Sequence, residues 1–406
     1  MVENKPRNNA TLIRRLVFDL LFINTFSITM IYYDFPFLAS IIPSNMFAAF
    51  PVIVAVILMV IRFIKNPRIR INVAIYLLII ALYILFSLMG NELIARFVNG
   101  SSFIVYTVVC LFLLLEDDIE CLTKHLIIDT YVVGIVYIAA CVFYSAGRLY
   151  SDNSAVSYMT LGYGMTLPTM LCYEFYRKEK HKTHLIMALI LSMLTLMFGN
   201  RGALIMISLY VIVWAIQSIG KNSNKKTILL ILIGSMFVVF VFFGGMNYVT
   251  NLIASIIGKA GFDSRNILKL ISGSVWIDRD RTLIRGKAYE MIAANPFAIR
   301  GPGALTREYI SQDLIGANAH NMFLELWVEY GILFGSVISI YLYKKIISAS
   351  KLKSYIVKDN CGILAFTTLM QALIMLFFSG TLYSCSALWI GLAMISACKA
   401  RERVYS

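Results

Sequence analysis

The histidine best suited to acid–base chemistry is His320, which directly precedes a long apolar run, 321–343. We expect this run to form a helix, so that His320 lies at its N-terminus. The positive end of the helix dipole favours the neutral imidazole at such a position. A neutral imidazole is the form that a general base requires. A single histidine at a helix end is also a common structural residue, so its position alone leaves both roles open.

Cationic side chains are concentrated in the segment 246–319, just before this histidine. We expect a helix from Asp280 to Ala294, ended by Asn295-Pro296. Arg281 and Arg285 share one face of that helix, because side chains four residues apart are neighbours. The other cations of the segment are Lys259, Arg265, Lys269, Arg279, Lys287, Arg300 and Arg307. The simplest interpretation of this net positive segment is a solvated loop that contacts anionic lipid head groups.

Two carboxylates follow His320 within the apolar run. Glu325 and Glu329 are four residues apart and therefore share a helix face. Carboxylates inside an apolar span are costly and are usually functional. We expect them to pair with arginines of the segment 246–319 or to bind hydroxyl groups of an acceptor.

The triplet Asp278-Arg279-Asp280 has the Asp-x-Asp pattern of metal-dependent nucleotide-sugar transferases. Arg279 and the adjacent Arg281 would neutralise these carboxylates and repel a divalent cation. We therefore expect local charge pairing at this triplet, and neither a metal site nor another cofactor.

The composition indicates what kind of scaffold must position these groups. The chain has 406 residues, of which 59% are hydrophobic and only 14% charged, and its mean hydropathy is +0.77. A soluble domain is about half apolar and a quarter charged, so a soluble globular protein is excluded. The net charge of +14 does not indicate a nucleic-acid partner, because the Lys and Arg residues lie mostly in short loops between apolar runs.

The hydropathy pattern predicts an all-α polytopic membrane protein, since each crossing of a bilayer needs roughly 20 apolar residues in a helix. We expect about twelve spans. These are 16–33, 46–64, 71–90, 101–115, 126–147, 155–176, 184–200, 202–219, 227–245, 321–343, 361–380 and 384–398. The organisation is then nine spans in 1–245, a large loop at 246–319 and three spans with a tail in 320–406.

The distribution of Lys and Arg in the short loops predicts the orientation. Basic residues gather in the N-terminal segment, in the loops 62–70, 177–182, 221–226 and 344–358, and in the tail after 398. By the positive-inside rule these parts are cytoplasmic, and so are both termini. The acidic loop 116–124 falls on the same side. The segment 246–319 lies outside, where we also expect an amphipathic helix in 251–272, broken near Gly261.

These motifs carry a family resemblance. The stretch 281–331 has an arginine before a helix that ends in proline, a Gly-x-Gly at 301–303, and His320-Asn321 opening a span that contains Glu329-Tyr330-Gly331. These motifs, in this order and together with Arg201-Gly202 between two spans, resemble those of the O-antigen polymerase and ligase superfamily. Ile299 and Arg300 are extra residues before the Gly-x-Gly. Arg285 stands where the family often has an aromatic residue, which leaves open whether Arg281 or Arg285 is the counterpart of the family's arginine.

The resemblance implies a GT-C-type glycosyltransferase of the bacterial cytoplasmic (inner) membrane. It implies an undecaprenyl-pyrophosphate-linked oligosaccharide as the donor, used on the outer face. Arg201 and Arg281 would bind the leaving pyrophosphate, and His320 would accept the proton of the attacking hydroxyl. Arg279, Arg285, Arg300, Asn321, Glu325 and Glu329 would bind substrate.

Two alternatives to a polymerase of O-antigen or capsule polysaccharide remain. An O-antigen ligase shares the chemistry but transfers the glycan to lipid A-core. A twelve-span flippase or transporter would be expected to carry ionisable residues inside its spans, where this sequence has few. A polymerase would act beside a flippase and a chain-length regulator. Arg201 could also simply mark the water-exposed end of a helical hairpin.

Overall fold

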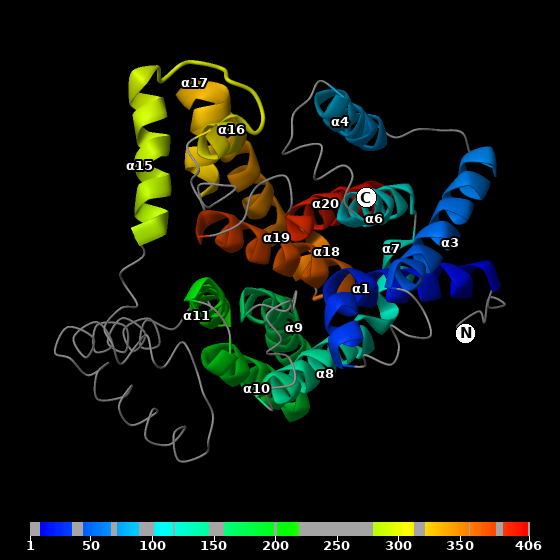
Figure 1. Ribbon diagram of the computed structural model, residues 1–406. Coiled ribbons are helices and arrows are strands. Elements are labelled where there is room, and N and C mark those ends of the chain that lie inside the picture. The colour runs from blue at the N-terminus through cyan, green and yellow to red at the C-terminus, as the bar shows by residue number, and fades with distance from the viewer. Residues whose placement is uncertain are drawn as a thin grey trace, which may run out of the picture. The chain divides into compact units, whose positions relative to one another are not determined.

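The computed structural model describes residues 9–34, 44–65, 71–88, 101–116, 118–145, 158–198, 201–218, 279–311, 321–356, 358–378 and 385–404. Almost all of these residues lie in helices, and none of them lies in a strand. The expectation of an all-α chain is confirmed for this part of the protein (Figure 1).

The helices follow the apolar runs closely. The first half of the chain contains α1 (Asn9–Asp34), α3 (Ser44–Lys65), α4 (Ile71–Leu88), α6 (Ser101–Leu115), α7 (Ile119–Leu122), the 3-10 turn η1 (Thr123–His125), α8 (Leu126–Ser145), α9 (Tyr158–Glu179), α10 (Lys182–Phe198) and α11 (Arg201–Ser218). The second half contains α15 (Arg279–Ala294), α16 (Ala304–Ser311), α17 (Met322–Ser350), α18 (Lys353–Ile356), α19 (Asn360–Phe378) and α20 (Ser386–Val404). Eleven of the expected spans coincide with helices, whereas 227–245 and the amphipathic stretch 251–272 lie outside the described residues.

Three helical stretches of the described residues are long and apolar enough to cross a membrane: Ile119–Phe143, Met322–Ser350 and Asn360–Phe377. Four shorter apolar helices accompany them, at Ala49–Ile64, Val73–Leu82, Lys182–Thr195 and Gly202–Ile212. Large aliphatic side chains on α3 and α4 point away from the protein, and Ile64 is 74% exposed. So much exposed apolar surface is consistent with a membrane protein.

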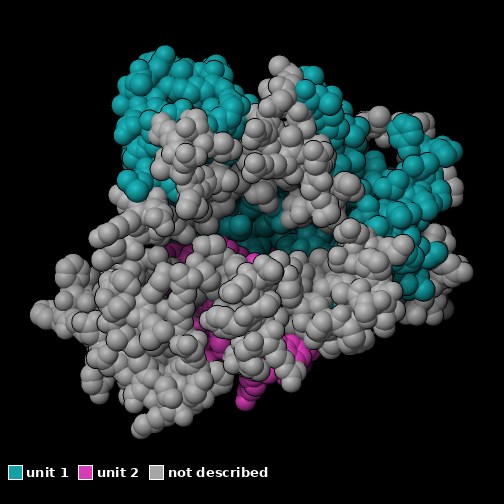
Figure 2. Space-filling view, in the orientation of Figure 1, with its two compact units in different colours: residues 1–133, 280–406 teal, residues 134–279 magenta. Residues whose placement is uncertain are grey.

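The chain divides into two compact units, shown in two colours in Figure 2. One unit comprises Met1–Val133 and Asp280–Ser406, and the other comprises Gly134–Arg279. In the first unit α19 and α6 both pack on α20, while α17 packs on α19 and α4 on α6. In the second unit α9 packs against both α10 and α11.

Ion pairs join distant parts of the first unit at one end of its helices. Arg401 near the end of α20 pairs with Asp359 and Glu120. Arg14 near the start of α1 pairs with Glu116 at 3.2 Å. The acidic stretch 116–124 therefore meets cations from the first and the last described helix.

Candidate functional site

The motif segments on either side of His320 pack together in the first unit. Helices α15, α16 and α17, drawn in yellow to orange in Figure 1, share a buried apolar core. The core is formed by Ile284, Ala288, Leu305, Tyr309, Leu324 and Val328. Stretches 279–311 and 321–331 thus form one local structure, whereas His320 lies outside the described residues.

Helix α15 confirms the helix expected before Asn295-Pro296 and begins one residue earlier, at Arg279. Its regular turns carry Arg281 and Arg285 at neighbouring positions of one face. The side chain of Arg285 is half-buried, and its Nε is shielded from solvent without a hydrogen-bond partner among the residues that the structure describes. A buried N–H without a partner costs about 1–3 kcal/mol. Arg285 is therefore an arginine whose side chain is only half-buried and whose Nε is not used by any described residue.

Arg300 has a different environment, although it was also expected to bind substrate. Its guanidinium donates to the backbone carbonyls of Met291 at 2.7 Å, Asn295 at 3.2 Å and Val328 at 3.3 Å. Two of these carbonyls belong to α15 and α17, near points where helical hydrogen bonding ends. A cation is favourable beside such carbonyls because it complements the negative end of the helix dipole. Arg300 thereby ties the end of α15 to α17.

Glu329 fixes the Gly301-Pro302-Gly303 turn to α17. Its side chain is 1% exposed, and Oε1 accepts a hydrogen bond from the Gly303 N–H at 2.5 Å. Its backbone carbonyl accepts from the N–H groups of Arg300 at 2.8 Å and Gly301 at 2.9 Å. Gly303 directly precedes α16, so this carboxylate also lies at the positive end of a helix. Glu329 thus binds the turn by accepting hydrogen bonds from the backbone N–H groups of Arg300, Gly301 and Gly303.

Asn321 caps the N-terminus of α17. Its Oδ1 accepts from the N–H groups of Phe323 at 2.9 Å and Leu324 at 3.2 Å, a standard use of asparagine at this position. Its Nδ2 donates to the carbonyl of Phe377 in α19 at 3.4 Å. The residue that follows His320 in the chain is therefore anchored on both α17 and α19.

Helix α17 is sharply bent at Gly331, which has φ 71° and ψ 163°. Trp327 Nε1 donates to Ser336 Oγ at 3.1 Å, although nine residues along a straight helix span about 13 Å. The N–H of Ile332, freed by the bend, donates to the Pro296 carbonyl at 2.8 Å. The helix expected over 321–343 is therefore present but divided by a bend that the sequence analysis did not predict.

The two carboxylates consequently lie on the short segment before the bend. Glu325 is 2% exposed and lies near Tyr309 of α16. Burial raises the pKa of Tyr309, and the charge of Glu325 raises it further. The Tyr309 hydroxyl donates to the Ile284 carbonyl at 2.7 Å, which links α16 to α15. No motif of the sequence points to Tyr309, and its only distinguishing signal is its position six residues after a Gly-x-Gly.

Arg201 is the first residue of α11 and belongs to the unit Gly134–Arg279, whereas Arg281 belongs to the other unit. The two helices of the expected hairpin are present, since α10 ends at Phe198 and α11 begins at Arg201, while the residues 199–200 that join them lie outside the described residues. The meeting of Arg201 with Arg281 and His320 stays a prediction. Among the described residues, no three His, Cys, Asp or Glu side chains converge as a metal site, and Asp278 lies outside them.

No protein-family model and no curated protein matches this chain. The sequence motifs and the contacts of α15, α16 and α17 are therefore the features that indicate a function.

Proposed function

We propose that this chain is a twelve-span GT-C-type glycosyltransferase of the bacterial cytoplasmic membrane. It polymerises an O-antigen or capsule polysaccharide on the outer face, using an undecaprenyl-pyrophosphate-linked glycan as donor and an incoming lipid-linked repeat unit as acceptor. Both termini are cytoplasmic. The pairing of Arg14 and Arg401 with carboxylates of 116–120 supports the placement of both termini on the same side as this loop.

The observation that carries the proposal is the contrast among the arginines of the packed motif unit. Arg300 and Arg307 donate to backbone carbonyls within this unit. Arg285 has a shielded Nε with no hydrogen-bond partner among the described residues. The local fold thus occupies some cations and leaves one available beside the Arg281 position. A departing pyrophosphate needs this kind of pre-placed cation, and guanidinium binds phosphate oxygens in pairs.

The reaction follows from these groups. His320 accepts the proton of an acceptor hydroxyl as its oxygen forms a bond with the anomeric carbon of the donor. The bond between that carbon and the pyrophosphate oxygen breaks, and the electron pair leaves with undecaprenyl pyrophosphate. Arg201, Arg281 and Arg285 stabilise the developing negative charge, with Arg279 as a further contact. No metal takes part, since guanidinium groups supply the charge.

The roles of the other motif residues follow from their contacts. Arg300, Asn321 and Glu329 hold the loop and the start of α17, so we assign them to positioning Arg285 and His320. Glu325, buried beside Tyr309, belongs to the same support. A displacement of a reacting group by about 1 Å can lower the rate by about a hundredfold.

The test uses purified full-length protein and an undecaprenyl-pyrophosphate-linked oligosaccharide, with chain extension followed on gels. We expect His320→Ala, Arg281→Ala and Arg285→Ala each to lower the rate by about 100-fold or more. Lys287→Ala is the matched control, because Lys287 lies on the same helix and pairs on the surface with Glu290 at 3.2 Å and Glu308 at 3.5 Å. Undiminished extension by His320→Ala and Arg281→Ala would refute the proposal.

Acceptors separate the polymerase from the ligase. We propose the polymerase, acting beside a flippase and a chain-length regulator. Extension of the lipid-linked repeat unit supports it. Transfer to lipid A-core with no extension would instead identify a ligase.

A flippase is the second candidate, and one observation favours it. Besides Glu325 and Glu329, three carboxylates of the described residues within the expected spans are buried: Asp19, Asp129 and Glu174. Asp19 contacts His125 at 2.9 Å, and Glu174 accepts from the Tyr210 hydroxyl at 2.6 Å and pairs with Arg177. Buried ionisable residues are typical of transport proteins. Movement of a labelled lipid-linked oligosaccharide across proteoliposomes, without extension, would identify this function.

A further inference from the structure

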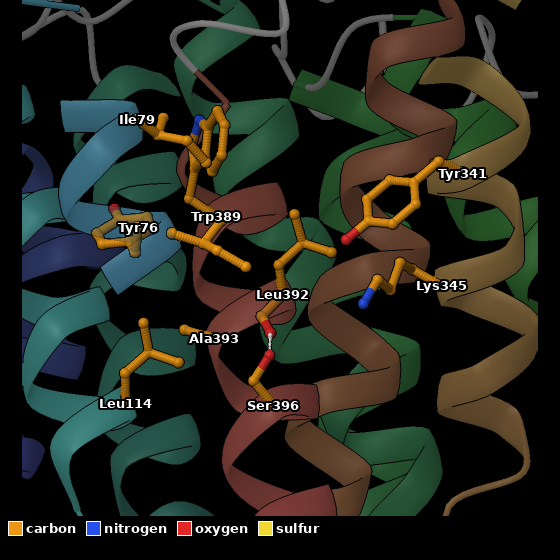
Figure 3. A pocket seen from close by; sticks show the side chains of 10 residues that line it. Tyr76, Ile79, Leu114, Tyr341, Lys345, Trp389, Leu392, Ala393 and Ser396 are labelled. Carbon is orange, nitrogen blue, oxygen red and sulfur yellow. Dashed lines mark hydrogen bonds between the residues drawn. The ribbon is translucent and has the colours of Figure 1, made fainter. Parts of the chain in front are cut away.

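A groove runs along the helices of the first unit, away from the motif residues. Its floor is the side of α20 that carries Trp389, Leu392, Ala393 and Ser396 (Figure 3). Its walls are α4 with Leu114 of α6 on one side and α17 on the other. The groove is open along one side, and the empty space between its walls, open solvent included, is about 560 Å³.

The packing of the helices explains the groove. Helices α6 and α19 lie on either side of α20, with α4 packed on α6 and α17 packed on α19. The outer helices therefore rise above α20 on both sides. Beside the groove, exposed apolar side chains cover α4 and α17, with Leu78 at 59% and Val337 at 63% exposure. An opening framed by such surface would face lipid acyl chains and exclude water.

Most of the lining is apolar, with an aromatic pair on one side. Ile75, Ile79 and Leu392 supply aliphatic surface. Tyr76 and Trp389 meet edge to face, with ring centroids 6.4 Å apart. An elongated hydrocarbon chain fits this lining better than a polar metabolite, because a polar ligand would lose its hydration without hydrogen bonds to replace it.

One end of the groove carries a cation. The Nζ of Lys345 lies 4.9 Å from the ring centroid of Tyr341, one turn away on α17. No carboxylate of the described residues forms an ion pair with Lys345. Two cations of α20 are engaged, since Lys399 donates to Ser348 and Arg401 pairs with Asp359. An uncompensated charge is thus left where the apolar groove meets the basic ends of α17 and α20.

We propose that this groove binds one acyl chain of an anionic phospholipid, with Lys345 contacting its phosphate. Lys345 is five residues from the end of α17, or about 7–8 Å along the helix. A lysine at this depth extends its ammonium toward the head-group region while its methylene groups cover apolar surface. Anionic head groups are attracted to cations at the membrane surface. On the proposed topology the lipid belongs to the cytoplasmic leaflet, so its site is distinct from that of the glycan donor.

Native mass spectrometry of the delipidated full-length protein in detergent tests the proposal. Phosphatidylglycerol and phosphatidylcholine with identical acyl chains are titrated separately. We expect one tightly bound phosphatidylglycerol and weaker binding of phosphatidylcholine. Lys345→Ala should weaken phosphatidylglycerol binding by about tenfold or more, while binding of phosphatidylcholine changes little. Lys344→Ala is the matched control, because Lys344 is exposed and does not line the groove.

A second measurement locates the acyl chain. Phosphatidylglycerol with brominated acyl chains should quench the tryptophan fluorescence of the wild type, and Trp389→Phe should lose the part of this quenching that comes from Trp389.

A larger side chain at the mouth of the groove provides a further check. Ile75 is half-exposed there, so Ile75→Trp should obstruct the binding of both phospholipids without changing the buried core.

Three results would overturn the proposal. The first is equal affinity of Lys345→Ala and wild type for phosphatidylglycerol. The second is an equal loss in Lys344→Ala, which would indicate a general surface effect. The third is displacement of bound phosphatidylglycerol by undecaprenyl phosphate at far lower concentration, which would make the groove an isoprenoid site. None of these readouts depends on glycosyl transfer.

Discussion

Replacing Gly331 by alanine tests the bend of α17 directly. Gly331 has φ 71° and ψ 163°, a backbone conformation that is essentially restricted to glycine and costs other residues about 1–3 kcal/mol. An added Cβ would also lie 2.9 Å from the Phe297 carbonyl oxygen, which is backbone and cannot turn away. Relieving such a contact costs about 1–3 kcal/mol. We therefore expect Gly331→Ala to lower the free energy of unfolding by about 2–6 kcal/mol.

Two other glycines of the same packed unit provide a graded control. Gly301 has φ +80° but open space around its Cβ position, so Gly301→Ala should cost only the left-handed conformation, about 1–2 kcal/mol. Gly286 lies inside α15, also with open space, and Gly286→Ala should stabilise the protein by about 0.5–1 kcal/mol.

Thermal unfolding of the three variants in one detergent gives the order. The melting temperature should be highest for Gly286→Ala, lower for Gly301→Ala and lowest for Gly331→Ala, with wild type between the first two. A melting temperature of Gly331→Ala equal to that of Gly286→Ala would refute the bend at Gly331. A cost equal to that of Gly301→Ala would show that the contact with Phe297 is absent.

Two further substitutions test the bonds that hold the motif unit together. Glu329→Ala should lower stability by about 2–3 kcal/mol because the Gly303 N–H loses a charged acceptor, whereas Glu329→Gln keeps an acceptor and should lose less; equal melting of both variants and wild type would contradict this bond. Tyr309→Phe should cost about 1 kcal/mol by removing the bond to Ile284, with Tyr289→Phe, 57% exposed, as a neutral control. Burial raises the pKa of Tyr309 above its ordinary value of 10.0. The contribution of Tyr309 to the free energy of unfolding should therefore be complete below pH 10.0 and be lost as the pH rises above it. Tyr309→Phe should abolish this part of the pH dependence of melting.

Helix positions were predictable from the sequence because hydropathy and turn residues are local signals. The end of α15 at Ala294 follows from Asn295-Pro296, and α10 and α11 flank the Gly199-Asn200 step. The length of an apolar run, however, indicates the length of a helix but not whether the helix is bent. The bend at Gly331 depends on a hydrogen bond from Ile332 to Pro296, 36 residues earlier in the chain.

The candidate site was predictable in its residue types but not in the division of roles. Arg285 and Arg300 look alike in sequence, since each follows apolar residues in the same cationic segment. They differ because α17 brings the Val328 carbonyl to Arg300 and no comparable group of the described residues to Arg285. Glu329 similarly binds Gly303 only because the bend brings the Gly-Pro-Gly turn beside it. Such partners are set by tertiary structure.

The ion pairs of Arg401 have a consequence for the synthesis of the chain. Glu120 is translated 281 residues before the arginine that neutralises it, which at about 5–20 residues per second is a delay of roughly 15–60 s. During that interval the acidic stretch has no cation from α20 and must remain in water. The last helix therefore completes the packing of the first unit, and a ribosome stalled before codon 401 would leave a protein whose earlier helices have formed but whose acidic stretch still lacks Arg401.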